Sequence, residues 1–492
     1  SAALASPSRP GTGERGASWL TAALWRGDSA GFASASARAA EPLADRIEAV
    51  LERADGEIAR LRHEGLLYAP PPPAALPPAP LADPPAAPAG VFTAAAERAL
   101  GDVGLWGLAI PEAHGGSGGS MLDLTRAITR LAANAPTAAG TLAVHSSIAA
   151  VAAVVGFGSE EQRSRFLPGL AAGRPLSVFA ATEGDAGCDL SRITTSLEDR
   201  DGRLLLSGTK MFITGATHGR LVKLLARRRG EPVVVLVRLP DVDTETFRLR
   251  RYALHPLKHA HNAALEFREL EVDPRDVLDP AAGRDAMAIV WHGLNRGRVT
   301  LAAQAAGTLR LLLGHARDHA VRRITWGQSI ATRQLVQGRL GRIAASIAAC
   351  DALTAWAAAA VDDDDRGGEW EAITAKVVAS QCVRDAAIDA LGVHGGRAFL
   401  VGHPLGDAFH DHFAVTVYEG ESDLLGLALF KGLARHHPLA ATRDAPAWRR
   451  VGEWLAWRAA TAAGRDRSDA DILDAVLRGH ARRARHTLRG LA

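Results

Sequence analysis

The 492-residue sequence has few cysteines, and their scarcity excludes two classes of site. Cys188, Cys350 and Cys382 lie far apart in the chain and form no CxxC pair. We therefore expect no disulfide framework and no zinc site, and a reducing cytoplasm suits the chain. A metal site is also not expected in the histidine-rich stretch, because no pair there has the i, i+4 spacing of helical ligands. That stretch comprises His394, His403, His410 and His412.

A large excess of charge is also missing. Lys plus Arg number 57 and Asp plus Glu 54, which argues against a surface built wholly for nucleic acid. Residues 1–10 lack a basic start followed by an apolar stretch, so no signal peptide is expected. The apolar segment Thr137–Gly158 contains His145 and runs straight into charged residues. We interpret it as a buried helix rather than a membrane span.

The first part of the chain is predicted to be helical. Residues 1–39 are rich in Ser, Ala and Gly and are expected to form a loosely ordered extension. Helical spacing of apolar residues then predicts an N-terminal helical domain over residues 40–175. Residues 70–88 interrupt it, because ten of these nineteen residues are proline. This insert is expected to be an extended linker or a surface loop, or else a ligand for a proline-reading partner.

The remainder is predicted to be a β domain followed by helices. Between residues 176 and 283, short β-branched or alternating runs without intervening helices predict a small antiparallel β domain. Residues 284–438 are predicted to form a C-terminal four-helix bundle, and residues 439–492 a basic C-terminal extension. The predicted strands are Ser177–Thr182, Leu204–Ser207, Leu221–Ala226, Pro232–Val237, Phe247–Tyr252 and Ala264–Val272. The predicted helices of the bundle are Ala286–Arg322, Arg333–Val361, Glu369–Leu391 and Ser422–Arg435.

The sequence Val417-Tyr418-Glu419-Gly420 presents an acid beside a glycine and after an aromatic residue. Glycine lets the backbone approach a ligand closely, so this position suits a base that removes a proton from a bound substrate. A surface glutamate before a turn is common, and the tetrapeptide alone proves little. Its significance comes from the motifs upstream.

Those motifs occur in a fixed order over roughly three hundred residues. They are Thr182-Glu183-Gly184-Asp185-Ala186-Gly187-Cys188-Asp189, Lys210-Met211-Phe212-Ile213-Thr214-Gly215, Arg323-Ile324-Thr325-Trp326-Gly327 and His394-Gly395-Gly396. Together with the glutamate they resemble the acyl-CoA dehydrogenase family, over about residues 104–435. The resemblance implies FAD as cofactor, and a reaction that introduces a double bond beside a thioester.

The resemblance also implies which residues contact FAD. Arg323 falls at the arginine that pairs with the flavin diphosphate, a charge-assisted contact that suits a guanidinium group. The other implied contacts are Phe179, Ala181, Thr182, Gly187, Cys188, Phe212, Thr214, Thr325, Trp326, Gln334, Gly392, Gly395, Gly396, Glu421 and Asp423. Some of these belong, in the family, to a neighbouring subunit. A homodimer or homotetramer is therefore implied.

Several positions depart from the family pattern. Gly392 stands in place of a glutamine that often helps to hold the diphosphate. Cys188 stands where serine is usual, Gly184 where proline is usual, and His410 replaces an arginine. Glu421 and Asp423 stand where neutral residues often contact the adenosine part. Two extra carboxylates there would repel a diphosphate unless they face ribose hydroxyls or solvent.

For the chemistry, the resemblance implies that Glu419 takes the α-proton while the β-hydrogen leaves as hydride to flavin N5. Some relatives place the base at the position of Gly297, where this chain has no carboxylate. That difference favours Glu419. Arg298, Tyr418 and Gly420 are implied to lie at the substrate; the alternative for Arg298 is a charge on the helix surface.

Other functions remain open. The thiol carrier is coenzyme A or the arm of an acyl carrier protein, and the implied reoxidant is an electron-transferring flavoprotein. Residues 441–492 carry eleven Arg against six acids, so a nucleic-acid-binding flavoprotein is an alternative, although a solvated helix is favoured. A degenerate relative that has lost flavin is another. Relatives that oxygenate amines or oxidise nitroalkanes tend to replace the glutamate, so Glu419 argues against them.

Overall fold

The computed structural model describes residues 19–20, 30–69, 90–280, 285–364, 368–400, 403–435 and 449. The proline-rich insert at 70–88 lies outside these residues, as does nearly all of the basic extension at 439–492. The predictions made for those two stretches therefore remain predictions.

The first half of the described chain is helical, as predicted. Two helix starts carry a capping box, in which a serine and the residue three positions later satisfy each other's backbone N–H groups: Ser120 with Asp123, and Ser159 with Gln162. The helices are α2 Ala30–Ala40, α3 Asp45–His63, α4 Ala94–Asp102, α5 Met121–Ala132, α6 Pro136–Ala143, α7 Ala150–Phe157 and α8 Glu160–Ala171. The short strands β1 Tyr68–Ala69 and β2 Val91–Phe92 pair antiparallel.

Helix α2 corrects the prediction of a loosely ordered extension over residues 1–39, because residues 30–40 are helical. Phe32 stacks on Trp356 of the C-terminal part, with ring centroids 4.8 Å apart, and Arg38 pairs with Asp363 at 3.0 Å. An alanine-rich stretch has high helix propensity, and this tertiary contact supplies the burial that the sequence pattern did not indicate.

The apolar segment Pro136–Phe157 is buried inside the fold. It comprises α6, a π-helical turn over Val144–Ile148 and α7. It is one of two helical segments in the described chain that are long and apolar enough to cross a membrane, and 78% of its most apolar window is buried. The other is Gln334–Asp363, at 44%. The prediction of a buried helix is confirmed for the first.

The β domain contains a mixed sheet with β3, β6, β4, β5, β9 and β8 in that order and β7 paired to β6. Its strands are β3 Ser177–Ala180, β4 Ser196–Arg200, β5 Arg203–Thr214, β6 Leu221–Arg228, β7 Glu231–Arg238, β8 Phe247–Arg251 and β9 Asn262–Val272. The predicted antiparallel pairing holds for β4–β5, β5–β9, β6–β7 and β8–β9. It is wrong for β3–β6 and for the single β4–β6 bridge, which are parallel.

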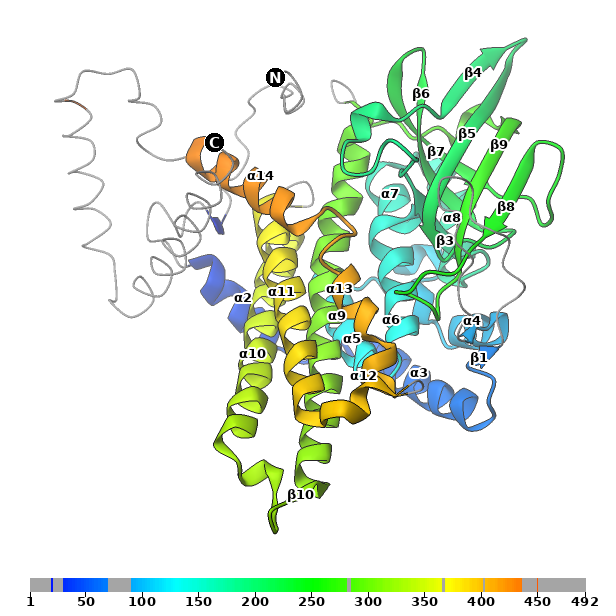
Figure 1. Cartoon of the computed structure of the whole chain (residues 1–492). Coiled ribbons are helices and arrows are strands. Elements are labelled where there is room, and N and C mark those ends of the chain that lie inside the picture. The colour runs from blue at the N-terminus through cyan, green and yellow to red at the C-terminus, as the bar shows by residue number, and fades with distance from the viewer. Residues whose placement is uncertain are drawn as a thin grey trace.

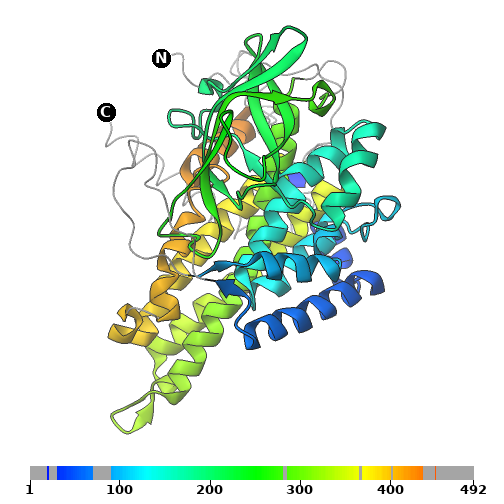
Figure 2. The same cartoon turned by 90° about the vertical axis from the view of Figure 1, so that its right-hand side faces the viewer.

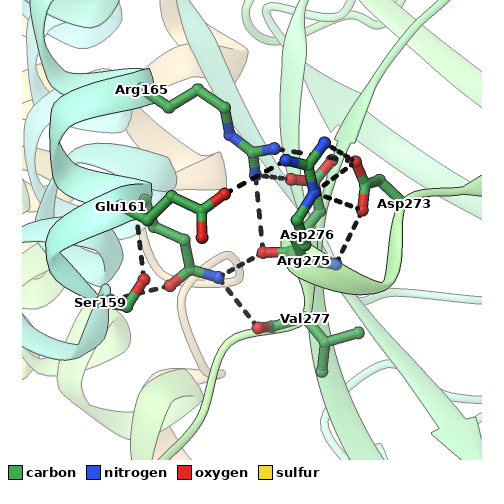
Figure 3. Close-up of polar contacts among 8 residues, drawn as sticks. Ser159, Glu161, Arg165, Asp273, Arg275, Asp276 and Val277 are labelled. Atoms are coloured by element: carbon green, nitrogen blue, oxygen red, sulfur yellow. Dashed lines mark hydrogen bonds and ion pairs between the residues drawn. The ribbon is translucent and has the colours of Figure 1, made fainter.

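A polar junction joins the β domain to α8 (Figure 3). The side chain of Gln162 donates to the backbone oxygens of Arg275 and Val277, at 2.8 and 3.0 Å. Arg165 pairs with Asp276, and Arg275 reaches Glu161 at 3.3 Å. The exposed ion pairs contribute little each, but the buried amide fixes the end of the sheet to the N-terminal turn of the helix.

The C-terminal part is a helical bundle. Its helices are α9 Met287–Arg322, α10 Gln334–Asp363, α11 Glu369–His394, α12 Pro404–Asp407, α13 Phe409–Ala414 and α14 Ser422–Arg435. All four predicted bundle helices are confirmed, with α9, α10 and α11 packed together and α14 lying on α11. One apolar core continues from α3, α4 and α5 into α9, α10 and α11.

Helix α9 spans most of the molecule. Its N-terminal half lies beside the β domain, and its C-terminal end lies at the β10–β11 hairpin, Ile324–Thr325 with Gln328–Ser329, at the opposite end of the bundle (Figures 1 and 2). At 1.5 Å per residue, about 39 Å of helix separates Gly297 from Arg323.

Candidate active site

A cavity of about 2640 Å³ opens between the β domain, α6, the N-terminal half of α9 and the turn before α14. It is larger than the roughly 300–1,000 Å³ of most small-molecule sites, so it has room for a cofactor and a substrate together. Phe179, Thr182, Phe212, Thr214 and Glu419 all line it. Seven further predicted site residues line it as well: Ala181, Gly187, Cys188, Arg298, Tyr418, Gly420 and Glu421. The structure thus brings twelve of the twenty predicted site residues to one space.

Glu419 occupies a tight turn between α13 and α14. Its backbone is left-handed, with φ of 58°, and Gly420 follows at 102°. The N–H of Ser422 donates to the oxygen of Thr416 at 2.9 Å and closes the turn. A left-handed conformation at a glutamate is uncommon and is kept only where surrounding contacts impose it.

The carboxylate of Glu419 lies against Gly297 of α9. A Cβ built on Gly297 would be 2.7 Å from Glu419 Oε2 and 3.1 Å from Oε1. A side chain at residue 297 and the present position of the carboxylate therefore exclude each other. Oε2 is shielded from solvent and has no hydrogen-bond partner in the described part of the chain. A buried carboxylate oxygen without a donor is costly, so this atom is poised for a proton or a ligand.

Burial raises the pKa of Glu419 to about 7, against the opposing effect of the positive charges of Arg298 and Lys376. Arg298 is buried, which excludes the surface-charge interpretation. Its Nε donates to the backbone oxygen of Glu419 at 3.2 Å and its Nη1 to Asn295 Oδ1 at 2.9 Å. Arg298 thus holds the backbone of residue 419 through one nitrogen and contacts Asn295 through another, and it also lines the cavity. Burial also raises the pKa of Tyr418.

Strand β5 also lines the cavity, through Phe212, Ile213 and Thr214. Its register shifts between Lys210 and Ile213, and Phe212 has φ of 57°. Irregularities of this kind turn a side chain out of the regular alternation, and the Phe212 ring is 44% exposed at the cavity. The N–H of Met211 donates to the oxygen of Thr182 at 2.9 Å, so the Thr182 loop and Phe212 are held side by side. Thr214 donates to Asn262 at 3.2 Å.

The buried pair of Glu183 and Lys210 anchors that loop. Lys210 Nζ donates to Glu183 Oε1 at 2.7 Å and to the oxygen of Ala181 at 3.0 Å, and Glu183 also accepts from Thr194 and Thr195. Burial acts to raise the pKa of Glu183, but these hydrogen bonds outweigh it and lower the pKa to about 2. Burial lowers the pKa of Lys210 to about 8.

We expect Glu183→Gln to destabilise the fold by about 3–5 kcal/mol, because a buried ammonium group loses its counter-charge. Urea denaturation of the two proteins measures the difference. The matched control is Glu198→Gln, an exposed residue of β4 whose ion pair with Arg200 is solvated; it should change stability by less than about 1 kcal/mol. Equal effects of the two substitutions would contradict the assigned role of the pair.

Several predicted cofactor residues lie elsewhere, at the far end of the bundle. The hairpin, the start of α10 and the end of α11 carry them, and most are exposed; Trp326 is 90% exposed. They are Arg323, Thr325, Trp326, Gln334, Gly392, Gly395 and Gly396. About 39 Å of α9 lies between these residues and Gly297, against which the Glu419 carboxylate lies, and none of the seven is among the residues that line the cavity. A single chain therefore does not unite the predicted FAD contacts.

Arg339 fills the space beside Gly392. A Cβ on Gly392 would lie 1.6 Å from Arg339 Nη1, so the glycine admits the guanidinium group. Asp389, which lies 3.9 Å from Arg339, is already paired with Arg342 at 2.7 Å. With glycine at residue 392, the guanidinium group of Arg339 occupies the space in which the side-chain amide of a glutamine was expected.

Glu421 caps a helix. Its carboxylate accepts from the N–H groups of Asp423 and Leu424, at 3.1 and 2.9 Å, at the start of α14. A carboxylate is favourable at a helix N-terminus, so its charge is compensated there. Asp423 is exposed in the first turn of the same helix. Gly187 and Cys188 are exposed beside Thr182, and Ala181 is buried behind it.

The sequence analysis gave no role to Lys376 or Arg339, nor to Lys210, which stands within one of its motifs. Lys376 lies on the face of α11 that also carries Ala372, Ala379 and Val383, all buried. The sequence does carry a signal for a buried lysine here, because Lys376 falls among apolar residues at helical spacing. Within the described ranges, no group of three or more His, Cys, Asp or Glu side chains is arranged to hold a metal ion.

Comparison with known proteins agrees with this geometry. Family models match three successive stretches: acyl-CoA dehydrogenase N-terminal domain over residues 79–174, middle domain over 178–270 and C-terminal domain over 287–433. An acyl-CoA dehydrogenase of Bacillus subtilis (strain 168) is 30% identical over 343 residues, which cover 68% of this chain and 88% of the relative.

Solved structures share the fold. Butyryl-CoA dehydrogenase from Megasphaera elsdenii superposes with a TM-score of 0.68 at 22% identity, over 80% of this chain and all of that one. The prolyl acyl carrier protein oxidase AnaB gives 0.64 at 24% identity, over 70% and 91% of the two chains. The chain therefore belongs to the acyl-CoA dehydrogenase family, whose members are FAD-dependent oxidoreductases.

Proposed function

We propose that this protein dehydrogenates an acyl thioester between its α and β carbons, with Glu419 as the base that takes the α-proton. The observation that carries the proposal is the carboxylate of Glu419. One of its oxygens is buried and has no hydrogen-bond partner among the described residues, and Glu419 lines the same large cavity as Phe212 and Thr214. The thioester belongs to coenzyme A or to an acyl carrier protein, since both present the same reacting atoms.

The residues at the cavity fit a flavin. An exposed aromatic ring at Phe212 offers a packing surface for a planar heterocycle, and the loop at Gly187 and Cys188 leaves exposed backbone where a ligand can approach closely. Thr182 and Thr214 add hydroxyl groups that can bond to its polar edge. FAD, when bound, supplies the acceptor for the hydride that leaves the β carbon.

Glu419 is suited to its part by its surroundings. A base works best when its pKa lies near the working pH, and burial brings the pKa of this carboxylate to about 7. The α-proton of a thioester is a very weak acid in water, so exclusion of water and alignment of the base with the substrate carbon do much of the work. Gly297 has no side chain, so the Glu419 carboxylate can lie against it, and Arg298 donates to the backbone oxygen of Glu419.

We further propose that two copies of the chain complete each FAD site. The residues at the hairpin end would then contact a flavin held mainly by the partner's cavity. An exposed apolar surface supports this pairing; at that end it comprises Val321, Ile324, Trp326, Leu335, Phe399 and Leu400. Apolar surface of this extent is typical of an interface. Electron-transferring flavoprotein is the reoxidant that we propose.

Trp326→Ala should weaken self-association roughly 30-fold, the usual cost of removing a central interface tryptophan. Sedimentation equilibrium over a dilution series measures the constant. Val242→Ala, which truncates an exposed apolar residue on the β domain, is the matched control and should leave association unchanged. An unchanged constant in the Trp326 variant would remove the hairpin end from the interface.

The proposed reaction is tested by a thioester screen. Purified protein loaded with FAD is mixed anaerobically with acyl-CoA and acyl carrier protein thioesters of different chains, and loss of visible flavin absorbance is followed. The proposal expects at least one thioester to reduce the flavin and the product to carry an α,β double bond by mass spectrometry. Reduction by amines or nitroalkanes but by no thioester would refute it.

A further inference from the structure

Lys376 is a buried cation in α11 that the reaction as proposed does not use. Its side chain is inaccessible to solvent. Its Nζ donates to the oxygen of Gly420 at 2.7 Å, to Ser422 Oγ at 3.0 Å and to the oxygen of Thr416 at 3.2 Å. All three acceptors belong to the turn that carries Glu419, and they lie on both sides of it in the sequence.

The three bonds favour the charged form of the lysine. An ammonium group has three N–H donors, and each of them has one acceptor here. A neutral amine has only two N–H groups, so its lone pair would face one of these oxygens. Ser422 Oγ itself lies 3.1 Å from the oxygen of Thr416, to which it can donate while it accepts from Lys376. The turn is thus tied to one cation at three points.

We propose that Lys376 is the positioning residue of the catalytic turn, which holds Glu419 in its left-handed conformation and supplies a fixed positive charge near its carboxylate. The inference rests on the proposed role of Glu419. Without the three bonds, the turn between Thr416 and Ser422 keeps its own short-range hydrogen bonds and two long-range contacts, Arg298 Nε to the oxygen of Glu419 at 3.2 Å and Ser380 Oγ to Ser422 Oγ at 3.1 Å. The three bonds of Lys376 are the contacts that tie both ends of the turn to one point, as a strained backbone requires. With them, the carboxylate is held against Gly297.

The positive charge of Lys376 also affects the pKa of Glu419. The ionisable groups that face Glu419 are Arg298 from α9, Lys376 from α11 and Tyr418 from the turn itself. Both cations favour the carboxylate form, and burial opposes it. Burial lowers the pKa of Lys376 to about 8, and the negative charge of Glu419 acts to raise it. Lys376 therefore remains largely protonated at the pH where Glu419 titrates.

The first test is independent of activity. Hydrogen–deuterium exchange of FAD-loaded Lys376→Met should be at least about tenfold faster than wild type in peptides that span residues 416–422, and unchanged in α9. Lys223→Met is the matched control, because Lys223 is also fully buried but lies on β6, where its ammonium group faces the ring of Phe179. It should leave exchange of residues 416–422 unchanged. Wild-type exchange there in Lys376→Met would overturn the inference.

The second test measures the effect of the positive charge of Lys376 on the pH dependence of the reaction. With a thioester that reduces the wild-type flavin, the pH midpoint of the reduction rate should rise by roughly one unit in Lys376→Met, because the carboxylate loses a neighbouring cation. Lys376→Arg retains the charge, so its rate should fall while its midpoint remains within about 0.3 units of wild type. A lysine with a structural role alone would lower the rate in both variants without moving either midpoint, and that result would overturn the electrostatic part.

A second variant and the exchange measurement cover the two ways in which the main tests could fail. If Lys376→Met does not fold, Ser422→Ala removes one acceptor and no charge, and it should give a smaller rise in exchange over residues 416–422. Exchange equal to wild type in that variant would count against the three-point anchor. If no thioester reduces the wild-type flavin, the proposed function fails, while the exchange measurement still decides whether Lys376 holds the turn.

Discussion

Glu419→Gln is expected to lower the rate of flavin reduction by thioester about 10²–10⁴-fold, the range that a positioned general base contributes. The amide has the same shape, so it fits against Gly297, but it cannot accept the α-proton. FAD content and thermal stability should remain near wild type, because no described side chain donates to Oε2. Stopped-flow absorbance with one saturating thioester measures the rate.

Glu419→Asp is the matched control for charge. It retains a carboxylate but withdraws it from Gly297 by about 1 Å, a displacement that can cost roughly 10²-fold. The expected order of rates is wild type, then the aspartate variant, then the glutamine variant. A glutamine variant as fast as the aspartate variant would show that ionisation of residue 419 is not needed.

Lys223→Met is expected to stabilise the folded protein by a few kcal/mol near neutral pH. Lys223 is fully buried, its Nζ has no hydrogen-bond partner among the residues that the structure describes, and it lies over the ring of Phe179, 4.4 Å away. Burial lowers its pKa to about 7. Methionine fills the same space without a polar atom.

The pH dependence follows from the sign of that shift. The ordinary pKa of lysine is about 10.4, so between about pH 7 and 10 the unfolded chain binds more protons at this position than the folded one. The stability contributed by Lys223 therefore rises with pH across that window, and the advantage of methionine should be largest below about pH 7 and shrink above it. Thermal denaturation with excess FAD at both ends of the window measures this. A gain that does not vary with pH would contradict the assignment.

Much of the fold could be predicted because its elements carry strong local patterns. Helix α14 begins and ends where the apolar spacing predicted, and β6, β7 and β8 match their predicted runs within two residues at each end. Strand β4, Ser196–Arg200, was missed because its sequence is mostly charged and Leu197 is its only fully buried residue. The parallel pairing of β3 could not be read from alternation, since neighbouring strands of either direction alternate alike.

The candidate site was predicted less completely, because the residues that hold its side chains in place are far from them in the sequence. Glu419 and Phe212 stand within recognisable motifs. Lys376 is 43 residues from Glu419 in the sequence, and nothing local indicates that its three donors reach that turn. The same holds for Arg339, whose guanidinium group fills the space beside Gly392. The repulsion expected between Glu421 and a diphosphate is reduced, because the Glu421 carboxylate accepts from N–H groups at the start of α14.

The proposed reaction begins with removal of the α-proton by Glu419, and proton exchange measures that step directly. A thioester with α-hydrogens but no β-hydrogens, such as phenylacetyl-CoA, is incubated in D₂O with the FAD-loaded protein, and α-deuteration is followed by NMR. Wild type should exchange the α-protons at least about 100-fold faster than Glu419→Gln. Equal rates of exchange in the two proteins would contradict the account.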